Sequence, residues 1–269
     1  GYMLTDIRGL QYRFDGPENR SGYRMVSGIS TKDGFRLRFE YASGGRLAGI
    51  ISSRGEFLKV ETDESGRVLC VSVNQDGEEV KLVRYRYDDR GDMVETIDAL
   101  DVSKHFVYSG GHLLVQLTNQ GGMSFHWEYE GKGENARCVH TWGDGGVMEY
   151  FIRYGKGYTH IRNGENAETE YYYGKDKLIY KIVDANGGIT RRQYNSFQEL
   201  EVTVNPEGYT RKTSYNEFGL PVRITDENGE DTFLDYDNNR NLVSLYTPCG
   251  KRLSWDYDGQ DRVVSRTTP

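Results

Sequence analysis

The chain has 269 residues, including 33 glycines, 21 tyrosines and 5 prolines, and its formal net charge is −7. This acidic balance provides no electrostatic surface for a general nucleic-acid binder, and no apolar run approaches the roughly 18 residues that a membrane-spanning helix needs. The first residues also lack the basic and apolar regions of a signal peptide, so we expect a soluble chain with no nucleic-acid partner and no membrane span.

Residues 1–40 are the least regular part of the sequence and are interpreted as an irregular, repeat-like entry. Within them, residues 12–15 (Tyr-Arg-Phe-Asp) resemble a tyrosine with its turn, and Asp33-Gly34 resembles a second turn. A repeat becomes clear at Tyr41, which is soon followed by the turn Gly44-Gly45. We expect residues 41–269 to form one continuous array rather than separate domains, because a repeat carried through most of a chain is typical of such arrays.

The intervals between the repeat tyrosines define the next units. Thr62 takes the place of tyrosine in one unit, and Tyr87 follows it by twenty-five residues. Later intervals of twenty-one, twenty-one, twenty-five and nineteen residues end at Tyr108, Tyr129, Tyr154 and Tyr173. The extra residues are predicted to lengthen turns near 74–79 and 131–135, since loops tolerate insertions at small cost.

From Tyr173 onward the repeat is strictly periodic. Four more tyrosines follow at intervals of twenty-one residues (Tyr194, Tyr215, Tyr236 and Tyr257), and a glycine turn lies about fourteen residues after each of the first four (Gly187, Gly208, Gly229 and Gly250). Asn-Gly and related pairs supply the positive φ angles of a tight hairpin, and the segments between turns have the usual strand length. The sequence therefore predicts an all-β array of stacked antiparallel hairpins, with eleven units and about twenty-two strands.

Three turns carry a specific resemblance: Tyr41-Ala42-Ser43-Gly44-Gly45-Arg46-Leu47, Tyr87-Asp88-Asp89-Arg90-Gly91-Asp92-Met93 and Tyr215-Asn216-Glu217-Phe218-Gly219-Leu220. They resemble the tyrosine-aspartate (YD) repeats of Rhs proteins, and the likeness covers nearly the whole chain. The resemblance implies a curved, spiralling sheet that is part of a hollow shell. It also implies the shell segment of a bacterial polymorphic toxin, which encloses a toxic C-terminal domain.

The resemblance further implies secretion, or delivery into a target cell by a type VI secretion apparatus or an insecticidal toxin complex, in bacterial competition. The implied partners are the chain's own C-terminal toxin domain, the remainder of the shell, a secretion-apparatus spike, a chaperone and an immunity protein. The self-cleaving core of the family ends in a motif with Asp-Pro, and this chain contains no Asp-Pro. We therefore expect neither the protease nor the toxin in this piece, whose open edge strands would favour self-association if it were expressed alone.

The residue types that usually carry chemistry form no convincing constellation. The five histidines, at positions 105, 112, 126, 140 and 160, form no zinc-spaced pair with a cysteine. The segment from Asp235 has Arg240 and Tyr246 where a calcium loop needs glycine and glutamate, and Gly131-Lys132-Gly133 lacks the third glycine of a dinucleotide loop. Cys70, Cys138 and Cys249 occupy different places in their repeats and are an odd number. We expect no catalytic residue, no metal and no cofactor, and the chain is not predicted to be an enzyme.

The repeat tyrosines have a structural interpretation, in which they form an aromatic ladder along the sheet, and a functional one, in which exposed rings bind glycan. We favour the structural interpretation because each tyrosine sits beside its turn in the same register. The predicted structural positions are Tyr41, Tyr87, Tyr108, Tyr129, Tyr154, Tyr173, Tyr194, Tyr215, Tyr236, Tyr257, Gly187, Gly208, Gly229 and Gly250. The alternatives to a toxin shell are a surface adhesion or glycan-binding array, as in teneurin-like shells, and a hydrolase within the first forty residues.

Overall fold

The computed structural model describes residues 1–6, 9–18, 21–31, 34–259 and 261–268. They fall into two compact units, Gly1–Trp127 and Glu128–Pro269. Asp33, from the turn expected at Asp33-Gly34, lies outside the described residues. The described part contains strands and two short 3₁₀ turns, and none of its helices is long and apolar enough to cross a membrane.

The first unit is a meander in which every strand pairs antiparallel with the next one along the chain. Its strands are β1 (Tyr2–Thr5), β2 (Gln11–Phe14), β3 (Gly28–Ser30), β4 (Arg36–Ala42), β5 (Arg46–Ser52), β6 (Phe57–Thr62), β7 (Val68–Gln75), β8 (Glu78–Tyr87), β9 (Met93–Asp98), β10 (Ser103–Tyr108), β11 (Leu114–Thr118) and β12 (Ser124–Glu130), the last of which crosses the boundary at Trp127.

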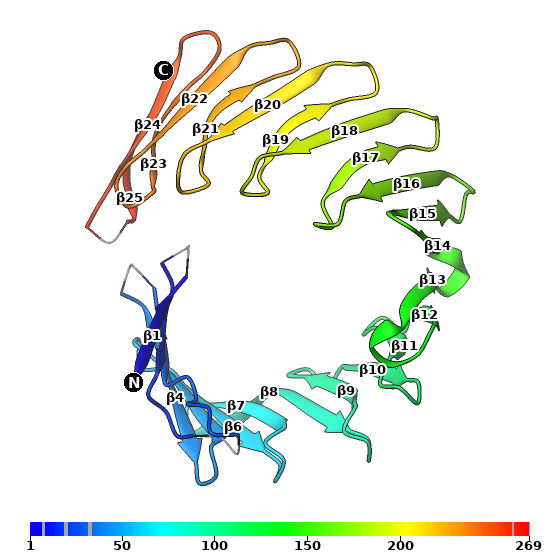
Figure 1. The fold of residues 1–269 in the computed structure, drawn as a ribbon. Coiled ribbons are helices and arrows are strands. Elements are labelled where there is room, and N and C mark those ends of the chain that lie inside the picture. The colour runs from blue at the N-terminus through cyan, green and yellow to red at the C-terminus, as the bar shows by residue number, and fades with distance from the viewer. Residues whose placement is uncertain (7–8, 19–20, 32–33, 260, 269) are drawn as a thin grey trace. The chain divides into compact units, whose positions relative to one another are not determined.

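The second unit continues the same pattern of consecutive antiparallel pairs, which Figure 1 shows side by side from β15 to the C-terminus. Its elements are η1 (Gly133–Asn135), β13 (Arg137–Gly143), η2 (Asp144–Gly146), β14 (Val147–Gly155), β15 (Tyr158–Asn163), β16 (Glu168–Tyr173), β17 (Ile179–Val183), β18 (Ile189–Tyr194), β19 (Leu200–Val204), β20 (Thr210–Tyr215), β21 (Pro221–Thr225), β22 (Asp231–Tyr236), β23 (Leu242–Tyr246), β24 (Arg252–Tyr257) and β25 (Val263–Thr267). The described strands that follow Tyr41 are β5 to β25, twenty-one against the predicted number of about twenty-two, and the prediction of an all-β array of antiparallel hairpins is confirmed.

A β-bulge recurs immediately before the repeat tyrosine. In the pair of β20 and β21, Ser214 is opposite Arg223 and Tyr215 is opposite Pro221, so Val222 is the extra residue. The same register shift precedes residues 41, 62, 87, 108, 173, 194, 236 and 257. Because a bulge increases the local twist and bends its strand, these recurring bulges bend each meander, whereas the pair of β14 and β15 keeps a continuous register at Tyr154.

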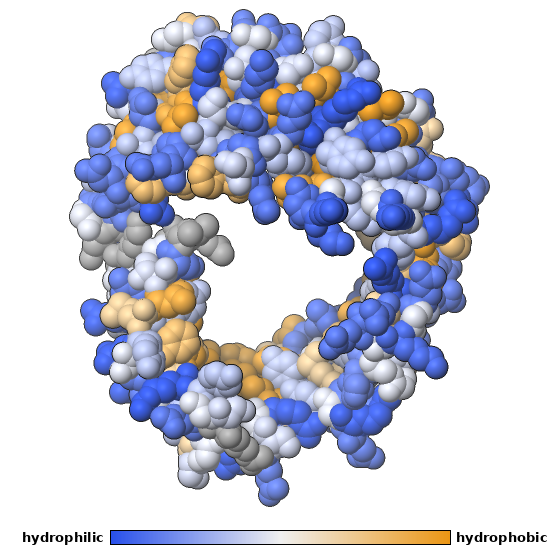
Figure 2. Space-filling view, in the orientation of Figure 1, coloured by the Kyte–Doolittle hydropathy of each residue, from blue (hydrophilic) through white to orange (hydrophobic). Residues whose placement is uncertain are grey.

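The cross-strand register separates two faces of the sheet in the second unit. On one face Leu234 pairs with Leu245, which pairs in turn with Leu253. On the other face Arg223 pairs with Phe233, and neighbouring rows carry charged and hydroxyl side chains. Figure 2 accordingly shows apolar patches interspersed with polar ones. The most buried side chains of the described residues are few: Val60, Cys70, Ile97, Ser52, Ser72, His160 and Ser244.

The predicted lengthening of turns is wrong at residues 74–79. Gln75 pairs with Glu78, so Asp76-Gly77 is a two-residue turn and the extra residues extend β7 and β8 instead. Asp76 and Gly77 have φ angles of 53° and 89°, as a type I′ turn requires. Additional cross-strand pairs stabilise a longer hairpin, whereas a longer loop adds only entropy cost. Near residues 131–135 the extra residues do form a loop, which contains η1.

Candidate functional site

Most of the repeat tyrosines link their unit to the one before it through their hydroxyl groups. The Tyr215 hydroxyl donates to the backbone carbonyl of Leu200 at 2.8 Å, and Tyr236 donates to the carbonyl of Pro221 at 2.9 Å. Equivalent bonds join Tyr41 to Val26, Tyr87 to Val68, Tyr154 to Cys138, Tyr173 to Tyr158, Tyr194 to Ile179 and Tyr257 to Leu242. In the strictly periodic part, each acceptor is the sixth residue after the preceding repeat tyrosine, so the bonds form a ladder along one edge of the array.

Burial of these rings changes their acidity. Desolvation raises the pKa of the hydroxyl groups of Tyr41, Tyr87, Tyr108, Tyr129, Tyr154, Tyr236 and Tyr257. Tyr108 ends β10 and Tyr129 lies in β12, and both are half-buried like the other repeat tyrosines. A raised pKa keeps a tyrosine protonated, and it therefore remains a hydrogen-bond donor.

The residue after the tyrosine builds the turn. Asn216 is an example: its Oδ1 accepts the N–H groups of Phe218 and Leu220, both at 3.0 Å, which is an Asx turn. Asp63, Asp88, Asn195 and Asp237 do the same in their units. The backbone N–H and the guanidinium of Arg67 lower the pKa of Asp63. The aspartate or asparagine of the repeat thus satisfies two backbone donors that the tight loop exposes.

The glycine turns have similar geometry, and they are not the two-residue primed turns that Asn-Gly pairs favour. At Gly229 the backbone N–H donates to the Asp226 carbonyl at 3.0 Å, and Asp226 N–H donates to the Glu230 carbonyl at 2.9 Å. Only Gly229 has a positive φ, of 82°, whereas a type I′ turn needs two such residues. The loop is therefore a three-residue loop, a type I turn followed by a left-handed glycine. Gly187, Gly208 and Gly250 have φ angles of 82°, 90° and 77° in the same place.

We expect Gly229→Val to lower the free energy of unfolding by about 1–2 kcal/mol, because an L residue in the left-handed region brings its Cβ close to a carbonyl oxygen. The space around Gly229 is open, so the cost comes from the backbone alone. Gly110→Val is the matched control, since Gly110 is also an exposed turn glycine with open space but without a positive φ. Urea unfolding of both variants tests this, and equal midpoints for the two would contradict it.

Side chains also connect successive turns along the tyrosine edge. Arg90 donates to the carbonyl of Ser109 at 3.0 Å, and His112 Nδ1 lies 2.7 Å from Asp92 Oδ1. In the second unit the Asn241 amide donates to Asp261 at 2.7 Å. These residues are about one repeat apart, so the edge is joined by polar contacts in addition to the tyrosine ladder.

One serine has a lysine and a glutamate beside it, an arrangement that a catalytic serine would need. The Ser72 hydroxyl donates to Glu79 at 2.7 Å, and the Lys59 ammonium lies 2.9 Å from the same carboxylate and 2.9 Å from Glu61. Ser72 is only 1% exposed, which leaves no room for a substrate. The hydrogen bonds to the two glutamates raise the pKa of Lys59, so its ammonium holds its proton, whereas a general base must be unprotonated to accept one. The cluster is a structural network between β6, β7 and β8.

The most elaborate histidine environment is that of His140 on β13. Its ring stacks between Trp142 and Phe151, with centroid distances of 4.2 Å to each, and its Nε2 lies 3.0 Å from Glu149. His160 on β15 is buried and lies 3.3 Å from Glu168. Within the described ranges, no three histidine, cysteine or acidic side chains come together in a way that would hold a metal ion. The contacts of both histidines are those of side chains that pack the strands together.

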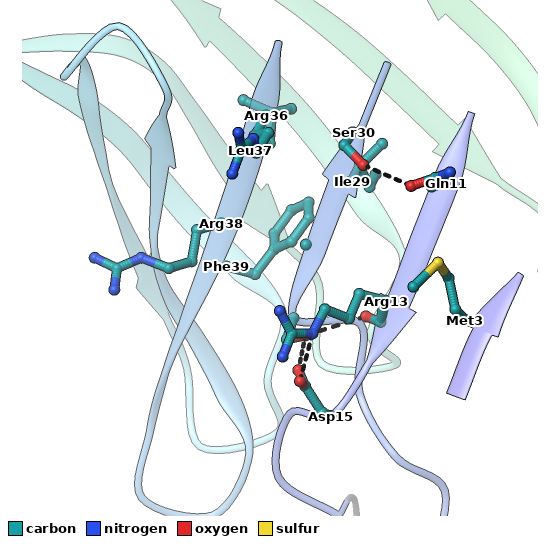
Figure 3. A pocket seen from close by; sticks show the side chains of 12 residues that line it. Met3, Gln11, Arg13, Asp15, Ile29, Ser30, Arg36, Leu37, Arg38 and Phe39 are labelled. Carbon is teal, nitrogen blue, oxygen red and sulfur yellow. Dashed lines mark hydrogen bonds and ion pairs between the residues drawn. The ribbon is translucent and has the colours of Figure 1, made fainter. Parts of the chain in front are cut away.

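A hollow in the first unit lies on β1 to β4 and has a volume of about 630 Å³. Figure 3 shows Arg13, Arg36 and Arg38 around it. Arg13 pairs with Asp15 at 2.5 Å and Arg38 with Glu40 at 3.1 Å, so two of the three guanidinium groups are neutralised by their neighbours. The hydrogen bond from Ser27 lowers the pKa of Asp15, which stabilises the carboxylate of that pair. The lowered pKa makes Asp15 a weak base for the Ser27 hydroxyl that is bonded to it.

The geometry thus defines a β-hairpin repeat protein whose recurring residues hold the array together. The sequence of this chain is 24% identical over 242 residues to "Probable deoxyribonuclease RhsB" of Dickeya dadantii (strain 3937), and the alignment covers 90% of the chain and 16% of that protein. This match confirms the resemblance of the chain to Rhs proteins. The chain spans about a sixth of that relative's length.

The other comparisons concern family models and solved structures. No family model matches the chain. Similar solved structures include "Crystal Structure of TcdB2-TccC3-TEV", with a TM-score of 0.42 and 11% identity over 97% of this chain and 20% of that one. "Structure of Photorhabdus luminescens Tc holotoxin pore, Mutation TccC3-D651A" has a TM-score of 0.40 and 10% identity over 96% of this chain and 20% of that one.

Proposed function

We propose that this chain is a shell segment of an Rhs-type secreted toxin and that it encloses a C-terminal toxic domain until delivery. The observation that carries the proposal is the match to RhsB, which runs through 90% of this chain but only 16% of that protein. A nuclease activity of the kind that its name states is assigned here to sequence outside the aligned part. The segment itself acts as a wall and not as an enzyme.

The structure of each unit supports a role as a wall. Every consecutive pair of strands within β1 to β12 and within β13 to β25 is joined by backbone hydrogen bonds. The tyrosine hydroxyl groups add a second connection between neighbouring units, as from Tyr215 to Leu200. A repeat array in which each unit is stabilised by its neighbours can extend without gaps, and an unbroken sheet excludes a protease from whatever lies behind it.

Limited proteolysis of the full-length protein tests the proposal. We expect the C-terminal domain to survive in the intact protein and to be degraded in a variant from which residues 1–269 are removed. A C-terminal domain that is equally sensitive in both would overturn encapsulation. The isolated segment, assayed on DNA, RNA, peptide and ester substrates, is expected to be inactive, and an activity that is lost on mutating its own residues would make it an enzyme.

A surface that binds glycan is the second candidate, and an exposed aromatic cluster favours it. Tyr158 and Tyr180 are 37% and 48% exposed, and their ring centroids lie 5.7 Å and 6.5 Å from that of Tyr172. The ring planes are tilted by 31° and 50°, and the Lys181 ammonium lies 3.5 Å from the Tyr172 centroid. Sugar rings stack best on flat, uncovered aromatic surfaces, so we rank this candidate second. If the parent chain binds glycans on an array and the Tyr158→Ala variant does not, glycan binding becomes the first candidate.

A further inference from the structure

Three Asn-Gly pairs occur in the chain, and the fold places them in two different environments. They are Asn163-Gly164, Asn186-Gly187 and Asn228-Gly229. Asn163 is the first residue of its turn, whereas Asn186 and Asn228 directly precede the left-handed glycine of theirs. An asparagine before glycine is the residue most prone to spontaneous deamidation, because glycine leaves its own backbone nitrogen sterically open to react. The environment of each pair therefore determines how readily its asparagine can deamidate.

Hydrogen bonds restrain both the side chain of Asn163 and the backbone of Gly164. Its side-chain Oδ1 accepts the N–H groups of Glu165 at 3.1 Å and Ala167 at 2.8 Å. The N–H of Gly164 donates to the carbonyl of Glu149 at 2.9 Å, which ties the glycine to the neighbouring strand β14. A Cβ at Gly164 would lie 3.3 Å from Glu149, so the glycine is also packed. The side chain of Asn163 must break two hydrogen bonds before its Cγ is within reach of the Gly164 nitrogen.

Asn186 and Asn228 have no such restraint. Both residues are exposed, and neither side-chain amide makes a hydrogen bond to the part of the chain that the structure describes. Gly187 and Gly229 have open space where a side chain would be. Their N–H groups donate only within the turn, to the carbonyls of Asp184 and Asp226, both at 3.0 Å. Opening one turn hydrogen bond frees the nitrogen, and no packing contact on that side of the glycine has to be broken.

We propose that Asn186 and Asn228 are sites of spontaneous deamidation in the folded protein and that Asn163 is protected. The Gly229 backbone nitrogen loses its proton and attacks the Asn228 side-chain carbonyl carbon, forming a carbon–nitrogen bond. The side-chain amide nitrogen leaves as ammonia and a five-membered succinimide remains. Water then adds to either carbonyl of the ring, which gives aspartate or isoaspartate. Gly187 and Asn186 react in the same way, and the proposal does not depend on the shell function.

The consequence is larger at Asn228 than at Asn186. Isoaspartate lengthens the backbone by one methylene within a three-residue loop, which displaces the hydrogen bond from Asp226 N–H to the Glu230 carbonyl. The new carboxylate also joins the acidic run Asp226, Glu227, Glu230 and Asp231, whereas the turn of Asn186 contains only Asp184. Like charges in close proximity repel. Modification at Asn228 therefore loosens the hairpin of β21 and β22.

Peptide mapping by mass spectrometry, after incubation of the purified chain in mildly alkaline buffer, tests the proposal. We expect conversion at Asn186 and Asn228 to be several-fold faster than at Asn163, with isoaspartate detected by an isoaspartyl methyltransferase assay. The same chain incubated in denaturant is the control, because there the three pairs are equally free and their rates should converge. An Asn228→Gln variant should lose the signal at that site alone.

Two outcomes would overturn the proposal. The first is equal conversion at all three pairs in the folded chain, because the environment would then have no influence. The second is slower conversion at Asn186 and Asn228 than at Asn163. If the Asn228→Gln variant is unstable, the comparison of Asn186 with Asn163 in the parent chain still decides between these outcomes.

Discussion

Tyr215→Ala is expected to lower the free energy of unfolding by about 2–3 kcal/mol, because truncating a large side chain loses both its burial and its contacts. The lower part of the usual range applies, since the Tyr215 ring is only half-buried. The variant also removes the hydroxyl that donates to the Leu200 carbonyl at 2.8 Å. Loss of one connection between units should therefore be visible in the unfolding of the whole array.

Tyr215→Phe separates the two contributions, since it keeps the ring and removes only the donor. We expect a loss of about 1 kcal/mol, the usual net value of one hydrogen bond. Tyr209→Phe and Tyr209→Ala are the matched controls, because Tyr209 lies in the adjacent glycine turn and is 57% exposed. Surface substitutions of this kind usually stay within about 0.5 kcal/mol of the parent. Urea unfolding measures all four variants, and a Tyr215→Ala variant as stable as Tyr209→Ala would show that the ladder carries no stability.

The repeat and its strands were predictable from sequence because turns are local. Asn216 and the left-handed Gly219 are both needed within five residues to close one loop. Such residues leave a visible signature at a fixed spacing, and this spacing locates the strands between the turns. The positions of Tyr215 and Gly229 followed from the same periodicity.

The role of the tyrosines was not predictable, because the partner of each hydroxyl is a backbone carbonyl. Leu200, Pro221 and Leu242 accept equivalent bonds although their side chains differ, so no residue type marks the acceptor. The bulge was not predictable for the same reason, because no residue type marks its position. Its extra residue is Glu201 in one unit and Val222 in the next, since a bulge depends on backbone pairing and not on one side chain.

The turn type could not be predicted from the sequence, because glycine is compatible with several loops. Gly77 belongs to a type I′ turn and Gly229 to a three-residue loop, although both have a positive φ. What separates them is the residue before the glycine: Asp76 has a positive φ and Asn228 does not. Asparagine and aspartate both tolerate either conformation, so the strand pairing on each side decides between the two loops.

Deletion of residues 195–215 is expected to leave a folded protein, because it removes one whole unit and joins Tyr194 to Asn216. Tyrosine is followed by asparagine at both ends of the deletion, so the junction restores a Tyr-Asn pair. The Asx turn therefore forms there and all later strands keep their direction. The hydrogen bonds from Tyr194 to Ile179 and from Tyr236 to Pro221 are retained. Repeat arrays lose stability in proportion to the units removed. We therefore expect a cooperative urea transition with a modestly lower midpoint and a smaller m-value.

Deletion of residues 195–204 is the contrasting variant, since it removes one turn and β19 only and joins Tyr194 to Asn205. Strand β20 must then take the place of β19 and run in the opposite direction, which turns over the rest of the sheet. Leu234 and its apolar neighbours would then lie on the face opposite to the apolar face of the strands before the junction, and Tyr215 would lie at the wrong edge. A sheet whose two faces are exchanged at one junction loses its register there, so we expect a much larger loss of stability or two separate transitions. If both deletions unfold alike, the twenty-one-residue hairpin is not the unit from which the array is built.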